Sequence, residues 1–435
     1  MASAAHHPTH RPTHAHPTHA HPTHAHPTHA HAPDPVHASN PPDPGRPSPF
    51  ERATQPEALH AAWEHVRRSA ASSAAASIRD EARRFASGVD ARLASIAREL
   101  REERFVFAPA RGIARPRAGK GPRPIVLAPV ESRVVTRALL EALSAVPAVA
   151  DLCRGVPTSF GGLPGRGVEQ AIAAVLAAVQ GGAAFHLRSD VADFFRAIPR
   201  DRALALIARA VGDERLARLV DAATRIEIEN LEALGEHGAL FPDAQLGVAQ
   251  GNSLSTLLGN ALLRGFDEAM NGRGITCLRY VDDVLFLGPR AAPVKKAFAA
   301  ATGRLAELGL RAYDPMREPG KAAMGPVAEG IAWLGCEIRD GVARPSADRR
   351  RALLLRVDHA LAEAGRGGGL AGALVAVDEA VRGFRGAYRF CACPEVFAAL
   401  DARIERRVEQ TFRLHRTRLA GPRRAVPRAP TARSA

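Results

Sequence analysis

The sequence contains no apolar run of about 18 residues, the length that a membrane-spanning helix needs, and no signal-peptide pattern. These two absences predict a soluble, cytoplasmic protein without a membrane partner. Cysteine is scarce as well: the five cysteines have neither disulfide-framework nor zinc-type spacing, and Cys391-Ala-Cys393 is one residue too tight for the usual CxxC. We therefore expect buried thiols in a reducing compartment.

Acidic residues are outnumbered, because 45 Asp and Glu face 59 Lys and Arg, which gives a formal net charge of +14. A strongly basic protein has nucleic acid as its default partner, since neutralised phosphates release counterions. A GC-rich genome would raise Arg, Ala, Gly and Pro together, so the charge supports this partner without deciding it. A length of 435 residues allows two or three domains with a sizeable core.

Low-complexity segments flank the chain. Residues 1–49 repeat a His-Pro-Thr-His-Ala unit and then become proline-rich, which predicts a disordered tail. Weak Ni²⁺ or Zn²⁺ binding by its histidines is an alternative to a tolerated repeat. Residues 50–104 carry apolar residues at helical spacing and predict two or three helices. Residues 419–435, with arginines among prolines, predict a disordered basic tail.

Two adjacent acids, Asp282 and Asp283, lie between short apolar runs within residues 277–288. Both flanks are rich in strand formers, so we predict a β-hairpin with the aspartates at its turn. Burying unpaired carboxylates costs several kcal/mol unless a cation compensates them. A pair of Mg²⁺ ions would do so, although an ordinary Asp-Asp turn remains open from these residues alone.

A third carboxylate, Asp190, ends another apolar strand over 184–190. Upstream, residues 105–130 predict two strands joined by a turn rich in Gly, Pro and basic residues. Guanidinium groups there suit a triphosphate, and a merely solvated hairpin is the alternative. The glycine-rich loop at 156–169 lacks the GK[ST] of a Walker loop. We further expect helices over 131–143, 201–234, 291–308 and 348–418, and one short strand over 331–338.

Several short segments follow one another along the chain. They are Ser159-Phe-Gly-Gly-Leu-Pro-Gly-Arg-Gly, Ser189-Asp-Val-Ala-Asp-Phe-Phe195, Gln250-Gly251 with Ser253 and Ser255, Tyr280-Val-Asp-Asp283, Gly330-Ile-Ala-Trp-Leu-Gly335 and Val381-Arg-Gly-Phe-Arg-Gly-Ala-Tyr388. In this order they resemble the SYGFRPGRS segment, first carboxylate motif, QGxxLS loop, YxDD box, primer grip and thumb of the reverse transcriptase family. The resemblance runs from roughly Phe105 to Leu414 and is closest to the bacterial group II intron-like branch.

The resemblance implies an α+β right-hand polymerase, with fingers and an antiparallel palm sheet over 105–345 and a helical thumb over 346–418. The implied activity is RNA-directed DNA polymerisation, in which dNMPs are added to a primer 3′-hydroxyl by a two-metal mechanism. The implied cofactor is Mg²⁺, with Mn²⁺ as a substitute. The implied partners are an RNA template, an RNA or DNA primer and dNTPs, and a cognate non-coding RNA is left open.

The resemblance also assigns site residues. Asp190, Asp282 and Asp283 would be catalytic and would hold the metals together with the backbone carbonyl of Val191. The implied nucleotide-binding residues are Arg111, Arg117, Arg123, Asp193, Phe195, Gln250, Gly251 and Lys321. The implied template and primer contacts are Arg166, Tyr280, Trp333, Leu334 and Gly335. An ordinary solvated cation is the alternative for each of the basic finger residues and for Lys321.

Phe195 stands where reverse transcriptases have an aromatic steric gate against a ribose 2′-hydroxyl, and Phe194 or Phe195 must in any case be ordinary core. The chain departs from the family at Asn252, Ser253 and Thr256 of the QGxxLS loop, and at Arg117, where a lysine is usual. No endonuclease extension follows the thumb, which argues against a complete mobile-intron protein. A role in defence or as a domesticated retroelement is expected. The alternatives are a non-enzymatic RNA-binding scaffold and another palm-fold nucleotidyltransferase.

Overall fold

The structure is a computed structural model that describes residues 46–73, 75–117, 120–243, 245–272, 274–363 and 369–420. It is a mixed helix and sheet fold, as predicted. Most of the two predicted tails lies outside these residues. Order begins before the predicted boundary at residue 49, because the Ser48 hydroxyl accepts a hydrogen bond from the Glu51 amide and the Glu51 carboxylate accepts one from the Ser48 amide. This capping box starts the first helix.

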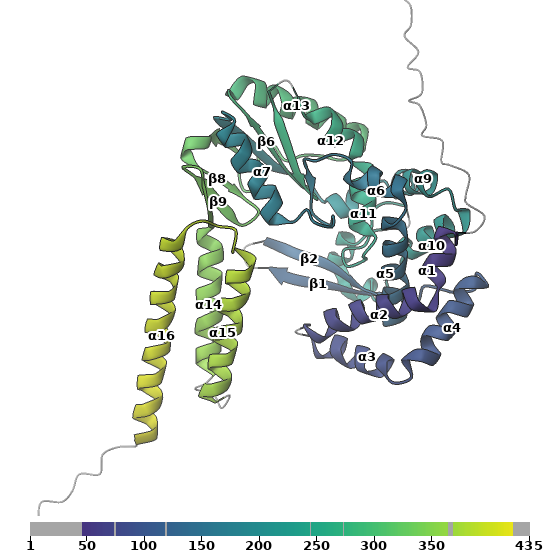
Figure 1. Cartoon of the computed structure of the whole chain (residues 1–435), viewed down its shortest axis with the longest axis horizontal. Coiled ribbons are helices and arrows are strands. Elements are labelled where there is room, and N and C mark those ends of the chain that lie inside the picture. The colour runs from purple at the N-terminus through teal and green to yellow at the C-terminus, as the bar shows by residue number, and fades with distance from the viewer. Residues whose placement is uncertain are drawn as a thin grey trace, which may run out of the picture. The chain divides into compact units, whose positions relative to one another are not determined.

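The N-terminal region contains four helices where two or three were expected. They are α1 (Pro49–Thr54), α2 (Pro56–Ala71), α3 (Ala76–Ala86) and α4 (Val89–Arg101). Gln55, in an extended conformation before Pro56, separates α1 from α2, and Gly88 separates α3 from α4 with a φ of +80°. Buried side chains such as Leu59 and Trp63 join this region to the largest hydrophobic core (Figure 1).

The predicted basic hairpin is present, with β1 (Arg111–Arg117) antiparallel to β2 (Lys120–Leu127). The expected continuous helix over 201–234 is wrong. The chain instead forms α9 (Arg200–Val211), α10 (Glu214–Thr224) and, after a non-helical segment, the 3₁₀ helix η1 (Glu232–Leu240). The reason is tertiary: the Asn230 side chain accepts a hydrogen bond from the Gly112 amide at 2.8 Å and donates one to the Gly112 carbonyl at 3.0 Å.

The palm sheet has five strands in the order β3-β5-β6-β4-β7. Their bounds are β3 (Ser159–Phe160), β4 (Phe185–Asp190), β5 (Thr276–Tyr280), β6 (Asp283–Gly288) and β7 (Ala322–Pro326). The pairings are antiparallel except that the short β3 is parallel to β5. Strand β7 was not predicted. Its residues Ala-Ala-Met-Gly-Pro lack the β-branched and aromatic residues that mark strands, so pairing with β4 determines it.

Helices cover both faces of this sheet. They are α5 (Val130–Ser144), α6 (Pro147–Arg154), α7 (Val168–Gln180), α8 (Phe194–Ala197), α11 (Ser255–Leu262), α12 (Arg264–Met270) and α13 (Ala291–Glu307). Alternate residues of β6 face opposite cores, because successive strand side chains point to opposite sides. Phe286 packs in the core that includes α13, whereas Leu285 and Leu287 pack in the core that includes α7 (Figure 1).

A second, three-stranded sheet follows the palm, with the order β10-β9-β8. Its strands are β8 (Ile331–Trp333), β9 (Cys336–Arg339) and β10 (Val342–Pro345), and the short 3₁₀ helix η2 (Val327–Glu329) precedes them. The expected single strand over 331–338 is therefore wrong. Leu334 and Gly335, with φ values of +49° and +79°, turn the chain into a hairpin instead.

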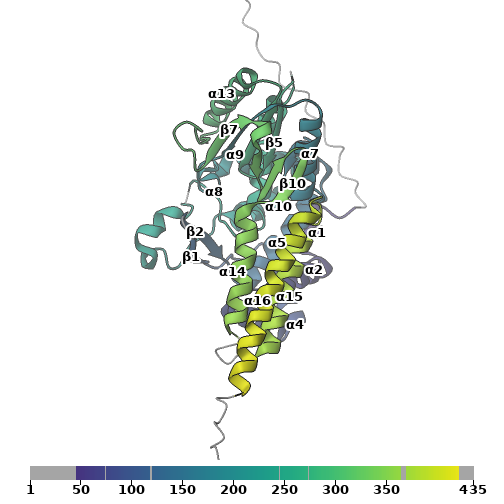
Figure 2. The ribbon, with the colours of Figure 1, turned by 90° about the vertical axis from the view of Figure 1, so that its left-hand side faces the viewer.

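Three helices form the C-terminal region: α14 (Ala347–Glu363), α15 (Leu370–Ala387) and α16 (Pro394–Ala420). Both views show them running side by side (Figures 1 and 2), and Leu353, Val377 and Leu400 bury their side chains between them. All five cysteines are free and buried, as predicted. Within the described residues, no helix combines the length and apolarity that crossing a membrane requires.

Candidate active site

The acidic pair lies at a tight hairpin. Tyr280, the last residue of β5, pairs with Asp283, the first residue of β6, so Val281 and Asp282 form the turn. The predicted hairpin is confirmed, with Asp283 beginning the second strand. Asp282 and Asp283 are both only partly buried, which leaves the edge of the palm accessible.

The structure brings Asp190 to the same edge. Asp190 is the last residue of β4 and lies directly across from Asp283 in the antiparallel register. The amide of the next residue, Val191, donates a hydrogen bond of 2.7 Å to the Asp282 carbonyl. Two strands that are far apart in the sequence therefore hold three carboxylates next to one another.

This crowding changes the proton affinity of the acids. Burial raises the pKa of the Asp283 carboxyl to about 7, and the neighbouring Asp190 raises it further, against a hydrogen bond from the Trp333 indole that lowers it. The indole Nε1 donates to Asp283 Oδ1 at 2.8 Å. Burial and Asp190 also raise the pKa of Asp282, whereas Arg123 and Lys321 lower it. In the absence of a cation, the three negative charges therefore destabilise one another.

Replacing Asp283 with asparagine should stabilise the metal-free protein. The unfolded Asp283 loses its proton near its ordinary pKa, whereas the folded carboxyl holds the proton up to about 7, so folding stability falls as pH rises between the two values. We expect Asp283→Asn to raise the free energy of unfolding by about 2 kcal/mol at about pH 8, and to change it little at about pH 4. Urea unfolding in EDTA at both pH values measures this. An equal effect at both would contradict it.

The donor set of this site suits a hard divalent cation, because carboxylate oxygens are the side-chain ligands that Mg²⁺ prefers. Among the described residues, no three His, Cys, Asp or Glu side chains are already gathered closely enough to hold a metal ion. Mg²⁺ usually keeps several waters and takes further ligands from substrate phosphates. A partly assembled set of three acids is therefore compatible with Mg²⁺ that arrives with a nucleotide.

Gln250 and Gly251 lie against the fingers hairpin. The Gln250 carbonyl accepts a hydrogen bond of 2.7 Å from the Val126 amide of β2. Gly251 has a φ of +117°, and a Cβ added there would lie 2.5 Å from the Val126 carbonyl oxygen. Glycine is required at this position by the approach of the β2 backbone. The expected close contact thus exists, and its partner within the protein is Val126.

The two phenylalanines after Asp190 differ in environment. Phe194 is buried, with 3% of its surface exposed, and Phe195 is half-buried with its ring centroid 5.4 Å from that of Phe194. The Val248 amide donates to the Phe195 carbonyl at 2.7 Å, which ties this residue to the loop that carries Gln250. Asp193 is mostly exposed and accepts a hydrogen bond from Arg196 at 3.0 Å.

The predicted cations lie at several places. Arg123 on β2 and Lys321, whose carbonyl lies 3.4 Å from the Asp190 amide, both lower the pKa of Asp282 and so act on the acidic edge. Arg111 lies at the base of the hairpin opposite Leu127. Arg117 donates from Nε to the Gly121 carbonyl at 2.9 Å near the hairpin tip. The structure thus brings two of these four cations into the field of the aspartates.

The predicted template and primer residues also divide. Trp333 contacts Asp283 directly, as described above, and Tyr280 adjoins it in the sheet. Arg166 donates to the Val156 carbonyl at 2.6 Å and therefore braces the loop before β3. Leu334 and Gly335 form the β8–β9 turn. A Cβ on Gly335 would lie 2.9 Å from Arg349 Nε and 3.0 Å from Tyr388 Oη, so this turn packs against α14 and α15.

The sequence analysis missed a buried arginine. Arg279 lies in β5 with 1% of its surface exposed and forms an ion pair with Asp267. An arginine within a strand whose neighbours are apolar was the available signal, because a buried guanidinium requires a set of acceptors. Arg279 stands three residues before Asp282, so its partners bear on the catalytic turn.

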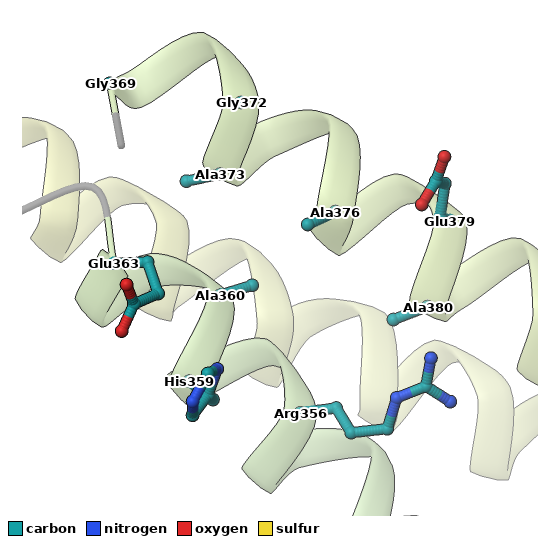
Figure 3. Close-up of a pocket in the computed structure, with 10 residues that line it drawn as sticks. All are labelled: Arg356, His359, Ala360, Glu363, Gly369, Gly372, Ala373, Ala376, Glu379 and Ala380. Atoms are coloured by element: carbon teal, nitrogen blue, oxygen red, sulfur yellow. The ribbon is translucent and has the colours of Figure 1, made fainter. Parts of the chain in front are cut away.

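A separate cavity of about 550 Å³ lies between α14 and α15. Its wall is formed by small residues, among them Ala360, Ala373 and Ala376, with Arg356 and Glu379 at its margin (Figure 3). None of the three aspartates lines it. The acidic edge of the palm, and not this cavity, carries the groups that can do chemistry.

Three carboxylates at the edge of an antiparallel palm sheet, next to a basic hairpin, define a palm-type nucleotidyltransferase site. The sequence model of the family described as "Reverse transcriptase (RNA-dependent DNA polymerase)" matches residues 115–337. The chain belongs to this reverse transcriptase family and carries its polymerase domain.

One curated relative is the "Uncharacterized 91 kDa protein in cob intron" of Schizosaccharomyces pombe, which is 27% identical over 173 residues. The match covers 40% of this chain and 20% of the relative, so the chain spans about a fifth of that protein's length. Two solved structures are similar. A chain of a partial Cas6-RT-Cas1–Cas2 complex has 20% identity, 60% and 42% coverage of this and that chain, and a TM-score of 0.35. Apo telomerase from Candida tropicalis has 12%, 68% and 59%, and 0.44.

Proposed function

We propose that this protein is an RNA-directed DNA polymerase that adds dNMPs to a primer 3′-hydroxyl on an RNA template, with release of pyrophosphate. The observation that carries the proposal is the meeting of Asp190 with Asp282 and Asp283 at an accessible edge of the palm. Membership of the reverse transcriptase family supports the reaction class.

The residues divide the work of the reaction. Asp190, Asp282 and Asp283, with the Val191 carbonyl, would hold two Mg²⁺ ions, or Mn²⁺ as a substitute. When bound, such ions activate the attacking hydroxyl and neutralise charge on the triphosphate and leaving group. Arg123 and Lys321 are the cations that act on Asp282, and they are suited to bind phosphate oxygens. Gln250, held against β2, would face the incoming nucleotide.

Primer extension tests the proposal. The purified protein is given an RNA template annealed to a DNA primer, with Mg²⁺ and either dNTPs or NTPs. We expect template-dependent extension with dNTPs that stops when EDTA is added. Binding of the duplex without extension would favour the RNA-binding scaffold instead, and a preference for NTPs would favour another palm-fold nucleotidyltransferase.

Phe195 is proposed as the group that excludes ribonucleotides. Its half-buried ring adjoins Phe194 and follows the strand that ends at Asp190. Removal of one steric contact changes discrimination by about 10- to 200-fold. We expect Phe195→Ala to lower the preference for dNTPs over NTPs by a factor in that range, measured as the ratio of kcat/KM values.

Phe194→Leu is the matched control for this experiment, because Phe194 is buried against Gly259. It should lower thermal stability and leave sugar discrimination unchanged. An unchanged ratio in Phe195→Ala, or an equal loss of discrimination in both variants, would remove Phe195 as the gate.

The finer assignments complete the proposal. Residues 50–104 would form an N-terminal helical region, 105–345 the fingers and palm, and 346–418 a thumb whose arginines follow the template–primer duplex. The motif pattern favours the bacterial group II intron-like branch and a role in defence or as a domesticated retroelement. A structured non-coding RNA gene, an intron boundary or defence genes beside the coding sequence would decide among these roles.

A further inference from the structure

Every N–H donor of the buried Arg279 guanidinium has an acceptor. Nε and Nη2 donate to the two carboxylate oxygens of Asp267 at 2.7 and 2.6 Å. Nη2 also donates to Ser159 Oγ at 2.6 Å, and Nη1 donates to Asn260 Oδ1 at 2.9 Å. The fifth bond runs from Nη1 to the carbonyl of Val281 at 2.9 Å. Asp267 alone neutralises the charge, so this last bond serves the geometry of the turn.

Val281 has an unusual backbone conformation. Its φ is +60°, in the left-handed region that a β-branched residue rarely enters. Such a conformation persists only where the surrounding structure enforces it. The residue is the first of the two in the turn, directly before Asp282, so its backbone angles determine where the Asp282 carboxylate lies.

Hydrogen bonds hold Val281 from both sides of its peptide unit. Its amide donates to the Phe160 carbonyl at 3.1 Å, and its carbonyl accepts from Arg279. The neighbouring Gly161 leaves the space that the Val281 side chain occupies, since a Cβ there would lie 2.6 Å from Val281 Cγ2. Asn260 bonds both Arg279 and the Gly161 carbonyl, the latter at 3.2 Å. The same network thus fixes the turn and the loop beneath it.

We propose that Arg279 is a positioning residue that enforces the left-handed conformation of Val281 and thereby holds Asp282 in its place at the acidic edge. The inference rests on the proposed function in that Asp282 is taken as a metal-binding carboxylate. It assigns to Arg279 a role beyond its ion pair with Asp267, which by itself would be an ordinary contact within the core.

The test combines Arg279→Lys with Val281→Gly. Lysine keeps the charge but lacks the planar fork, so it cannot bond Asp267 and the Val281 carbonyl in the same way. Because misplacement of a reacting group by about 1 Å costs roughly 10²-fold, we expect Arg279→Lys to lower kcat by about that factor with little change in KM for dNTP. Glycine adopts a positive φ without strain, so adding Val281→Gly should restore at least a tenth of the lost rate.

Arg200→Lys is the matched control. Arg200 is equally buried and donates to the Gly247 carbonyl at 3.0 Å, away from the turn. Val281→Gly should not restore any activity that Arg200→Lys loses. An Arg279→Lys enzyme with unchanged kcat, or a loss that Val281→Gly leaves in place, would overturn the proposal.

Two further measurements keep the test decisive. Mn²⁺ binding, followed by the electron paramagnetic resonance signal of free Mn²⁺, should weaken in Arg279→Lys and recover in the double variant, and this readout does not need polymerisation. If the parent protein fails to extend a primer, the proposed function fails while Mn²⁺ binding still tests the turn. Should Arg279→Lys not fold, Ser159→Ala removes one acceptor and keeps the ion pair. It should cause a smaller loss of kcat that Val281→Gly again relieves, and no such relief would overturn the proposal.

Discussion

Replacing Asp282 with asparagine is expected to lower dNTP incorporation by about 10³-fold or more, which corresponds to about 4 kcal/mol of transition-state stabilisation. Asparagine has nearly the same size but lacks the negative charge that a divalent cation requires. Asp190→Asn should have the same effect, because Asp190 and Asp283 face each other in the sheet and Asp190 acts electrostatically on both turn aspartates. Single-nucleotide incorporation under pre-steady-state conditions measures both variants.

Binding must be measured beside the chemistry. Affinity for a fluorescent RNA–DNA duplex should remain within a few-fold of the parent, since phosphate contacts by basic residues dominate affinity. Asp90→Asn is the control, because this aspartate of α4 is 86% exposed and its replacement should change neither quantity. Polymerisation that survives in both Asp190→Asn and Asp282→Asn would refute the assignment of the site.

The second large effect is expected for Gly251→Ala. The new Cβ would lie 2.5 Å from the Val126 carbonyl oxygen, a backbone atom that cannot rotate away, and the φ of +117° is strained for alanine. Relief requires the β2 strand to separate from Gln250 and weakens their hydrogen bond of 2.7 Å. We expect a loss of about 2–4 kcal/mol in unfolding free energy and about a 100-fold loss of kcat/KM, measured by urea unfolding and primer extension.

Gly303→Ala is the corresponding control. Gly303 lies in α13, and a Cβ there would meet no atom within 4 Å. Alanine in an exposed helix interior should stabilise by up to about 1 kcal/mol and leave extension unchanged. If Gly251→Ala unfolds and extends primers like the parent, the close approach of β2 to the Gln250–Gly251 loop is not required.

Local pattern predicted the elements that carry the acids. The apolar runs around Asp282 and Asp283 indicated two strands joined at the aspartates, and β5 and β6 form this hairpin. The strand before Asp190 and the basic hairpin were identified in the same way, since strand formers and Gly/Pro-rich turns act over a few residues. Helix spacing likewise located α5 and α13 within one residue at each end.

Long-range contacts determined the errors. Residues 225–231 leave the helical path because Asn230 bonds the backbone of Gly112, a residue 118 positions away. Strand β7 forms because β4 offers it an unpaired edge. Arg279 attracted no interpretation because its acceptors Ser159 and Asp267 become visible only when β3 and α12 are brought to β5. None of these contacts leaves a periodic trace in the sequence.

The sequence by itself determined which residues carry charge and on what kind of element each stands, because strand and turn propensities depend on near neighbours. Only the tertiary structure decided that Asp190 faces Asp283 across one ladder, that Gly251 meets β2, and that Arg279 supports the turn from below. The physical reason is that strand register and buried ion pairs join residues up to 120 positions apart, and such pairings are selected by packing and not by local propensity.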